Sequence, residues 1–369
     1  MKKISILVDQ FYEHGGIEKL VALKANYWST VFNYDVTIVA TENKDKPYIY
    51  PLEQSINFLD LGVNYNRDKS YFSIENIRLL FKNILKIQSY IFKEKPDFVV
   101  VASHIPITYI LPFLKLGKTK IVKEFHFTQY YRKDDRSLKK KIFNIIESKY
   151  DKLIVLSQEE RSYYKTDNVV VIPNPIPKIQ ILDKIDKKPE KEKIASAVVR
   201  FAPVKRLEVM IDIWNTFIKR GNKDWILYIY GDHNNEYGAK IKTLVNKFNL
   251  SKYIVFKGQI DNVLENLVGS RVLLLTSSQE CFPMVILESY SVGVPVISFD
   301  CPTGPRNIII NEKDGILIKN NSIDTFVKRL ESFALDEVVQ GEMSKKALLS
   351  AQKYTMDKVM NMWKKEVFI

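Results

Sequence analysis

Two glutamates in the C-terminal half, Glu280 and Glu288, have the residue type and spacing of a site that binds hydroxyl groups. Glu280 follows the apolar run 272–275, and Glu288 lies inside the predicted helix 283–292. Because a helix rises about 1.5 Å per residue, Glu288 stands roughly 8 Å along the helix axis and shares a face with Met284. Carboxylates only accept hydrogen bonds, so sugar and ribose hydroxyls are suitable donors. The structural alternative is that Glu288 faces solvent on a half-buried helix.

The first turn of the same predicted helix has the features of an anion site. Pro283 suits the first helical position, where a missing N–H costs nothing. Amide groups at the start of a helix have no carbonyl partner within the helix, and the helix dipole favours negative charge there. We therefore expect the segment Phe282, Pro283, Met284 and Val285 to lie against a phosphate group.

Basic side chains and paired glycines elsewhere would complete a diphosphate site. Arg200 and Lys205, the latter followed by Arg206, occupy a predicted loop directly after an apolar strand. Two or three cations at such an edge can neutralise a diphosphate, whose departure leaves growing negative charge. Gly15 and Gly16 join the first predicted strand to the first helix and permit a ligand to approach the backbone closely.

The elements that position these residues alternate along the whole chain. Short β-branched runs and amphipathic stretches follow one another, which predicts βαβ units and parallel sheets. The segment 98–102 is apolar on both faces, as expected of a parallel strand covered by helices. Prolines at 173–177 and a charged segment at 183–193 interrupt the pattern, so they predict a linker. The predicted class is α/β, with two doubly wound parallel-sheet domains whose carboxyl strand ends border one cleft.

The individual elements can be placed by residue number. We expect strands near 4–9, 35–41, 56–62, 97–103, 120–126, 152–157, 169–173, 194–199, 225–231, 253–257, 271–276, 294–299 and 315–318. We expect helices near 17–30, 75–94, 138–149, 158–164, 207–219, 236–248, 261–268, 283–292, 322–335 and 355–367.

Charge and hydropathy limit the classes of partner. The chain has 369 residues and a formal net charge of +13, and it contains no apolar run of the roughly 18 residues that a membrane span needs. The segment 115–152 holds twelve basic and five acidic residues, interleaved with apolar ones. Either a solvated lysine-rich surface or contact with an anionic membrane explains this segment. No nucleic-acid-binding module can be recognised, so nucleic acid is not an expected partner.

Several motifs, taken in order, resemble those of retaining glycosyltransferase family 4. Glu280 and Glu288 match that family's E-x(7)-E signature. The other motifs in the same order as in the family are Gly15-Gly16, the segment 172–175, the Arg200/Lys205 pair, the segments 230–232, 256–258 and 293–297, and Gly304-Pro305. The resemblance covers nearly the whole chain and implies the GT-B fold, in which two Rossmann-like domains face each other. The acceptor-binding domain would be 1–175 with the returning C-terminal helix 355–369, and the nucleotide-sugar-binding domain would be 194–353.

The resemblance also implies a role for each candidate residue. Arg200 and Lys205 would hold the donor diphosphate, Glu288 the ribose, and Glu280 the hexose hydroxyls beside the reacting carbon. The backbone at Phe282, Pro283, Met284 and Val285, together with Gly16, would complete the phosphate site. His126, which ends the predicted strand 120–126, would be an active-site histidine near the donor sugar and the acceptor. The alternative for His126 is a packed side chain between Phe125 and Phe127.

The implied reaction is transfer of a hexose or N-acetylhexosamine, with retention, from a nucleotide-diphosphate sugar, with UDP favoured. No metal ion and no cofactor are expected, and the acceptor would be a glycan or a lipid-linked glycan. Abundant lysine, isoleucine and asparagine indicate a bacterial coding sequence, so cell-envelope polysaccharide is the expected product. The predicted location is cytoplasmic, or peripheral on the inner face of the membrane through 115–152. Two other interpretations stay open, a sugar-nucleotide epimerase of GT-B fold and a non-enzymatic basic protein that binds surfaces.

Overall fold

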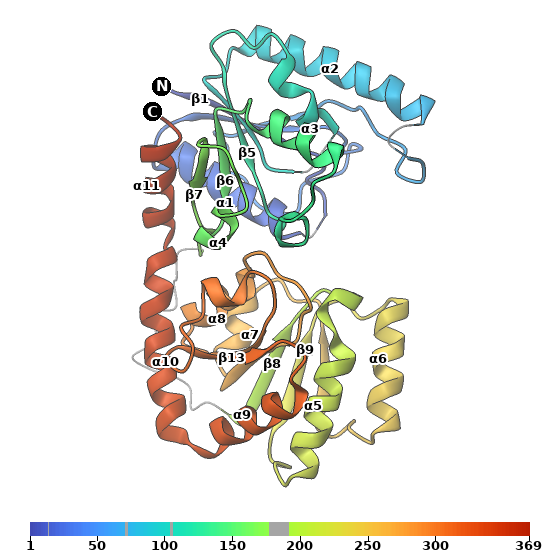
Figure 1. Cartoon of the computed structure of the whole chain (residues 1–369), viewed down its shortest axis with the longest axis vertical. Helices are drawn as coiled ribbons and strands as arrows, with labels where there is room; N and C mark the ends of the chain where they lie inside the picture. The colour runs from blue at the N-terminus through green and yellow to red at the C-terminus, as the bar shows by residue number, and fades with distance from the viewer. Residues whose placement is uncertain (14, 71–72, 104–105, 177–191) are drawn as a thin grey trace. The chain divides into compact units, whose positions relative to one another are not determined.

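The computed structural model describes residues 1–13, 15–70, 73–103, 106–176 and 192–369. The chain divides into two units, Met1–Pro175 with Met356–Ile369, and Ile176–Thr355 (Figure 1). Each unit is a parallel sheet covered by helices, which confirms the predicted α/β class. Most of the charged segment predicted as a linker lies outside the described residues. No helix in the described ranges is long and apolar enough to cross a membrane.

The sheet of the first unit has the strand order β3-β2-β1-β4-β5-β6-β7. Its strands are β1 (Lys3–Val8), β2 (Asp35–Ala40), β3 (Asn57–Asp60), β4 (Phe98–Val101), β5 (Lys120–Glu124), β6 (Lys152–Val155) and β7 (Val169–Val171). Its helices are α1 (Gly16–Thr30), α2 (Ile74–Glu94), α3 (Leu138–Glu147) and α4 (Gln158–Arg161), with short 3-10 turns at η1 (Pro106–Tyr109), η2 (Leu111–Phe113) and η3 (Tyr130–Arg132).

Alternate side chains of each central strand enter two separate cores. In β4 and the residue after it, Phe98, Val100 and Ala102 pack on the side of α1, whereas Val99 and Val101 pack on the side of α2. The period-two alternation of a strand places successive side chains on opposite faces. Because helices cover both faces, every position of this strand is apolar, as the sequence predicted.

The sheet of the second unit has the strand order β10-β9-β8-β11-β12-β13. Its strands are β8 (Ile194–Val198), β9 (Ile226–Tyr230), β10 (Ile254–Gly258), β11 (Val272–Leu275), β12 (Val296–Asp300) and β13 (Gly315–Lys319). Its helices and turns are η5 (Pro203–Lys205), α5 (Leu207–Lys219), α6 (Glu236–Lys247), α7 (Val263–Leu267), α8 (Met284–Ser291), η6 (Pro305–Asn307), α9 (Ile323–Leu335), α10 (Glu337–Ala351) and η7 (Gln352–Tyr354). The sequence did not predict α10.

The last helix, α11 (Met356–Glu366), belongs to the first unit and packs against α1. The Trp363 and Trp28 rings have centroids 5.2 Å apart, and Phe368 meets Trp28 edge-on at 4.9 Å. The two termini are also joined, because Lys2 Nζ donates to the carbonyl oxygen of Phe368. The predicted return of the C-terminal helix to the first unit is therefore present (Figure 1).

Candidate functional site

The carboxyl edge of the second sheet brings Lys205 and Glu280 into direct contact. Lys205 Nζ lies 2.6 Å from Glu280 Oε1, and Ser277 Oγ donates to the same oxygen at 2.7 Å. The Lys205 side chain is 23% exposed and that of Glu280 is 11% exposed, so the pair is partly shielded from water. A charge-assisted hydrogen bond of this kind fixes both groups at the strand ends. Two residues 75 positions apart in the sequence thus share one site.

Hydrogen bonds to backbone carbonyls connect the Lys205 loop to the residues that follow β11. Ser278 donates its amide to the carbonyl of Val204 at 2.9 Å, and Thr276 Oγ1 donates to the carbonyl of Lys205 at 3.0 Å. Arg206 returns two bonds, from Nε to Thr276 O at 2.8 Å and from Nη2 to Ser277 O at 3.0 Å. Arg206 therefore holds backbone in place, and the prediction of a third cation for the diphosphate is not supported at this position.

The loop that leads from Glu280 into α8 is fixed from the opposite side. Glu280 donates its amide to Pro302 O at 3.0 Å and accepts at its carbonyl from the amide of Thr303 at 2.6 Å. Gly304 lies so close to this loop that a Cβ would fall 2.5 Å from Pro283 Cδ. A larger residue would displace the segment that begins the helix, so the Gly304-Pro305 motif has a packing reason.

Helix α8 begins at Met284, and Pro283 is its N-cap rather than its first helical residue. This corrects the predicted position of Pro283 by one residue. The first-turn amides of Met284 and Val285 lie where a helix has no internal acceptors for them. The predicted phosphate segment, from Phe282 to Val285, therefore lies at a helix N-terminus, immediately after the Lys205–Glu280 pair.

Glu288 lies within α8 and is only 5% exposed. A solvent-facing glutamate would be largely exposed, so the structural alternative for Glu288 is wrong. Burying a carboxylate is costly unless polar partners compensate. Its burial beside apolar Leu287 and Ile286, both without exposed surface, is the unusual feature of this helix.

Arg200 lies in the exposed loop that follows β8. The turn after β9 passes close to this loop, because a Cβ on Gly231 would lie 2.0 Å from Val199 O. Gly231 also has φ +138°, a conformation that non-glycine residues rarely adopt. The structure thus places Arg200 and Lys205 on one short connection after β8.

Gly15 and Gly16 of the first unit differ in what the fold demands of them. Gly15 is the N-cap of α1, and a Cβ there would lie 1.9 Å from Glu18 Oε2. Burial raises the pKa of the Glu18 carboxyl group that folds back over this position. Gly16 begins α1, and a Cβ there would meet no atom within 4 Å. Packing explains the glycine at 15 but not the glycine at 16.

His126 follows β5 and is buried beside an ion pair that the sequence did not reveal. Lys24 Nζ of α1 donates to both carboxylate oxygens of Glu124, and His126 Nε2 lies 3.4 Å from Glu124 Oε2. All three side chains are at most 7% exposed. Phe127 is 62% exposed, so His126 is a packed side chain, as the alternative expected, but it packs beside the ion pair rather than between two phenylalanines.

The charges around His126 set its protonation. Burial alone would raise the pKa of Glu124, but the Lys24 ammonium and His126 outweigh it and lower the pKa to about 2. Burial lowers the pKa of His126 more than the nearby carboxylate raises it. Neutral imidazole and ionised Glu124 are therefore the expected states at neutral pH.

We expect Lys24→Met to lower the free energy of unfolding by about 3–5 kcal/mol, because it leaves the Glu124 charge buried without its cation. The double variant Lys24→Met/Glu124→Leu removes both charges and should be clearly more stable than the single variant. Urea unfolding of the wild type and both variants measures this. A double variant no more stable than Lys24→Met would show that the ion pair is not what couples the two positions.

The same pair gives a dependence of stability on pH. The pKa of Glu124 in the folded protein, about 2, lies below the ordinary value of 4.5. Ionised Glu124 therefore stabilises the fold above about pH 4.5. That contribution should fade as the pH falls from 4.5 towards 2. The double variant should lack this component of the pH profile.

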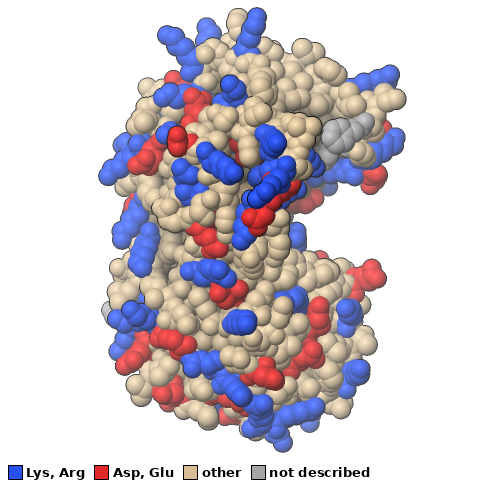
Figure 2. Space-filling model, in the orientation of Figure 1, with Lys and Arg blue, Asp and Glu red and all other residues tan. Residues whose placement is uncertain are grey.

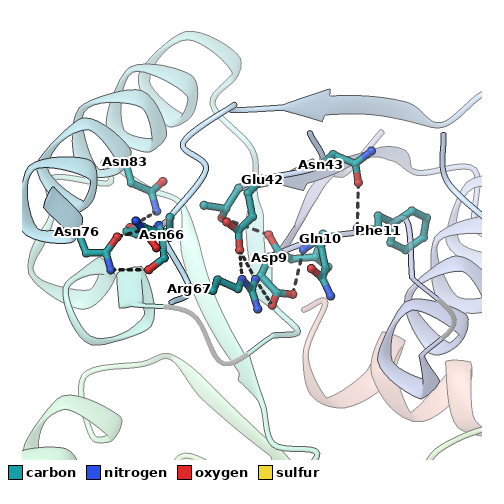
Figure 3. Close-up of polar contacts among 12 residues, drawn as sticks. Asp9, Gln10, Phe11, Glu42, Asn43, Asn66, Arg67, Asn76 and Asn83 are labelled. Atoms are coloured by element: carbon teal, nitrogen blue, oxygen red, sulfur yellow. Dashed lines mark hydrogen bonds and ion pairs between the residues drawn. The ribbon is translucent and has the colours of Figure 1, made fainter. Parts of the chain in front are cut away.

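A polar network at the carboxyl edge of the first sheet was not predicted as a site (Figure 3). Arg67 Nη2 lies 3.1 Å from Asp9 Oδ2, and Arg67 also bonds Glu42 Oε1. Asp9 and Glu42 follow the ends of β1 and β2, and Glu42 is 1% exposed. Asn43 Oδ1 accepts from the amide of Phe11 at 2.9 Å. Ligands of open α/β sheets bind at such strand ends. The positions of Asp9 and Glu42 just after two predicted strands could therefore have identified this network from the sequence.

Two lysines of the basic segment 115–152 are buried and do not contribute charge to its surface. Lys123 is 2% exposed and donates to Ser103 O at 2.6 Å, and burial lowers its pKa to about 7. Lys140 is 9% exposed and donates to Gln129. In Figure 2, the Lys and Arg side chains are spread over the visible face among acidic ones. The predicted concentration of charge is thus weaker than the residue count suggests.

The two Rossmann-like units, with cations, carboxylates and a helix N-terminus at the carboxyl edge of the second sheet, define the GT-B class of fold. A variant of Staphylococcus aureus TarM, solved in complex with Fondaparinux, alpha-GlcNAc-glycerol and UDP, resembles the chain with a TM-score of 0.77. The two share 16% sequence identity over 99% of each chain, so this likeness bears on the fold.

Family comparisons divide the chain near the boundary between the units. Residues 14–178 match the family described as Glycosyltransferase Family 4, and residues 178–350 match Glycosyl transferases group 1. Together the two matches support the GT-B glycosyltransferase family for this chain.

Two relatives match along almost their full length. The chain is 26% identical to the amylovoran biosynthesis glycosyltransferase AmsD of Erwinia amylovora, over 98% of this chain and 99% of that protein. It is 25% identical to an uncharacterized glycosyltransferase of Haemophilus influenzae, over 99% of each. Glycosyltransferase relatives of this kind support a transferase activity.

Proposed function

We propose that the protein transfers a hexose or N-acetylhexosamine from a UDP-sugar, with retention of configuration, to a glycan or lipid-linked acceptor. The observation that carries this proposal is the contact between Lys205 and Glu280 immediately before the α8 N-terminus, with Glu288 buried in the same helix. Cations and amides suit a diphosphate, and carboxylates suit hydroxyl groups. The UDP bound by the S. aureus protein supports uridine as the nucleoside of the donor.

Each residue of the site has a task in this reaction. Arg200 and Lys205 would neutralise the diphosphate as it leaves, and the amides of Met284 and Val285 would bind its oxygens. Glu288 would accept from the ribose hydroxyls, and Glu280 would lie beside the reacting carbon. The leaving phosphate would take the proton of the acceptor hydroxyl on the same face of the sugar, which retains the configuration.

The first unit would hold the acceptor. His126, as a neutral imidazole, suits a hydrogen bond with a sugar hydroxyl of the donor or the acceptor, whereas Gly16 leaves room for the donor phosphates at the start of α1. Asp9, held by Arg67, offers a further acceptor for a polyhydroxylated glycan, and buried Glu42 fixes the same Arg67 side chain. The amylovoran assignment of AmsD supports synthesis of a bacterial envelope polysaccharide, and contact with the inner face of the membrane would suit a lipid-linked acceptor.

Transfer is expected to continue in EDTA, because Arg200, Lys205 and the α8 N-terminus supply positive charge and the chain has no Asp-x-Asp motif. The measurement is acceptor-dependent release of UDP from UDP-sugars, with and without EDTA. Loss of release in EDTA that manganese restores would contradict the metal-independent mechanism. UDP-sugar conversion without an acceptor would favour the epimerase, and no turnover with any nucleotide sugar would favour the surface-binding protein.

A further inference from the structure

Helix α2 carries a row of large apolar side chains on its outward face. Four of them follow the spacing of one helix face, and Phe92 continues it two turns later. We call this row the α2 stripe, and its members and exposed fractions are Ile74 (73%), Ile77 (38%), Phe81 (63%), Leu85 (69%) and Phe92 (80%).

The α2 stripe is not needed for the core of the first unit. The opposite face of the helix, with Ile87 and Ile91 fully or almost fully buried, already packs on the sheet. Eighteen residues separate the ends of the stripe, so it runs about 27 Å along the helix. Single exposed apolar residues are ordinary on a soluble protein, but five large ones along one helix face indicate a surface that a membrane or another molecule covers.

Basic side chains accompany the stripe. Exposed Arg78, Lys82 and Lys93 lie on α2 itself. At its C-terminal end, a hollow of about 390 Å³ is lined by Phe92 together with the lysines Lys95, Lys115 and Lys118, and by Asp97 among others. An apolar row bordered by lysines is the pattern of a helix that lies in the interface of an anionic membrane.

A second exposed row lies over the same face of the sheet. Helix α3 presents Leu138, Ile142 and Ile145, which are 73%, 47% and 57% exposed and follow i, i+4, i+7 spacing. Ile146 of α3 packs on the same core as α2, so both helices cover one side of the first unit. Exposed Lys139 and Lys141 border this second row.

We propose that the α2 stripe, assisted by the α3 row, docks the first unit on an anionic lipid bilayer. The proposal rests on the membrane contact in the proposed function and assigns that contact to a surface. Binding to vesicles tests it without a measurement of sugar transfer. A second copy of the chain fits this face less well, because it would bring the same cations against themselves. Phosphate headgroups complement the lysines, while the apolar side chains enter the acyl boundary.

The test is flotation of the full-length protein with vesicles of phosphatidylcholine alone or mixed with phosphatidylglycerol. Phe81→Ser/Leu85→Ser should lower partitioning onto anionic vesicles at least tenfold, because two large apolar side chains in the middle of the stripe are lost. Leu335→Ser/Val338→Ser, which changes two residues of the second unit that are 80% and 72% exposed, is the matched control and should bind as the wild type does. Unchanged thermal unfolding of both variants would show that the fold is intact.

Charge is tested separately. Lys115→Gln/Lys118→Gln should reduce the preference for anionic over neutral vesicles, and higher ionic strength should weaken binding of the wild type. Equal binding to both vesicle types, no binding to either, or equal losses in the α2 variant and its control would overturn the proposal. So would dimers in sedimentation that Phe81→Ser/Leu85→Ser abolishes, since a second copy would then cover the stripe.

Discussion

Replacing Glu280 with glutamine is expected to lower kcat by roughly 10²-fold or more while donor binding survives. Glutamine keeps the shape of the side chain and still accepts from Lys205 and Ser277, which lie 2.6 and 2.7 Å from Glu280 Oε1. It lacks the negative charge that would meet the developing positive charge on the transferred sugar. Because that interaction strengthens only in the transition state, the loss should appear in kcat rather than in KM.

The measurement is steady-state transfer with donor and acceptor both varied. Glu342→Gln, an exposed change on α10, is the matched control and should leave both constants unchanged. Near wild-type kcat in Glu280→Gln would refute the assignment and make His126 the next candidate. A rise in KM alone would move Glu280 to a purely binding role.

Lys205→Met is expected to reduce kcat/KM for the donor by roughly 10²–10³-fold. The ammonium would face the departing diphosphate, and its removal also takes away the cation that Glu280 contacts. Binding of UDP separates these two effects. UDP has the diphosphate but lacks the transferred hexose. Lys205→Met should therefore weaken UDP binding, while Glu280→Gln should leave UDP binding intact.

Calorimetric titration of UDP measures that separation. Lys219→Met, on the exposed part of α5, is the control for loss of one lysine from the second unit. Equal UDP affinity in the wild type and Lys205→Met would place the diphosphate elsewhere. A loss of UDP binding in Glu280→Gln as large as in Lys205→Met would show that the pair acts only as a structural contact.

Hydrophobic pattern was enough to predict most of the fold. The apolar runs at 98–101 and 272–275 are central parallel strands, and the turn residues around them mark the elements that follow. Glu280 and Glu288 could be singled out because carboxylates interrupt an apolar pattern just after a strand. Local sequence carries that signal, and it needs no knowledge of distant partners.

Helix α10 was missed because polar and small side chains interrupt the apolar residues of its buried face. The residues that it buries are Gln340, Met343, Ser344, Ala347, Ser350 and Ala351. Ser344 Oγ donates to Gly293 O at 2.6 Å, and Ser350 Oγ donates to Asp314 Oδ2 at 2.6 Å. Small and hydrogen-bonded side chains can pack closely, but they do not produce the periodic hydrophobic pattern from which an amphipathic helix is predicted.

Pairings between distant residues also lay beyond sequence reasoning. Lys24 and Glu124 are 100 positions apart, and nothing near either residue announces a buried ion pair. Lys205 and Arg206 are adjacent cations with different tasks. The Arg206 side chain donates to the backbone carbonyls of Thr276 and Ser277, just after β11, whereas that of Lys205 contacts Glu280. Residue type gives the available chemistry, whereas tertiary contacts decide which charges remain accessible.

The most direct test of the central claim is the product formed from an α-linked UDP-sugar and envelope glycan acceptors in the presence of EDTA. The account predicts release of one UDP for each sugar transferred and an α-linkage at the new anomeric centre, read by nuclear magnetic resonance. A β-linked product would contradict retention. Absence of transfer from every nucleotide sugar, with a folded protein and a full acceptor panel, would contradict the assignment as a glycosyltransferase.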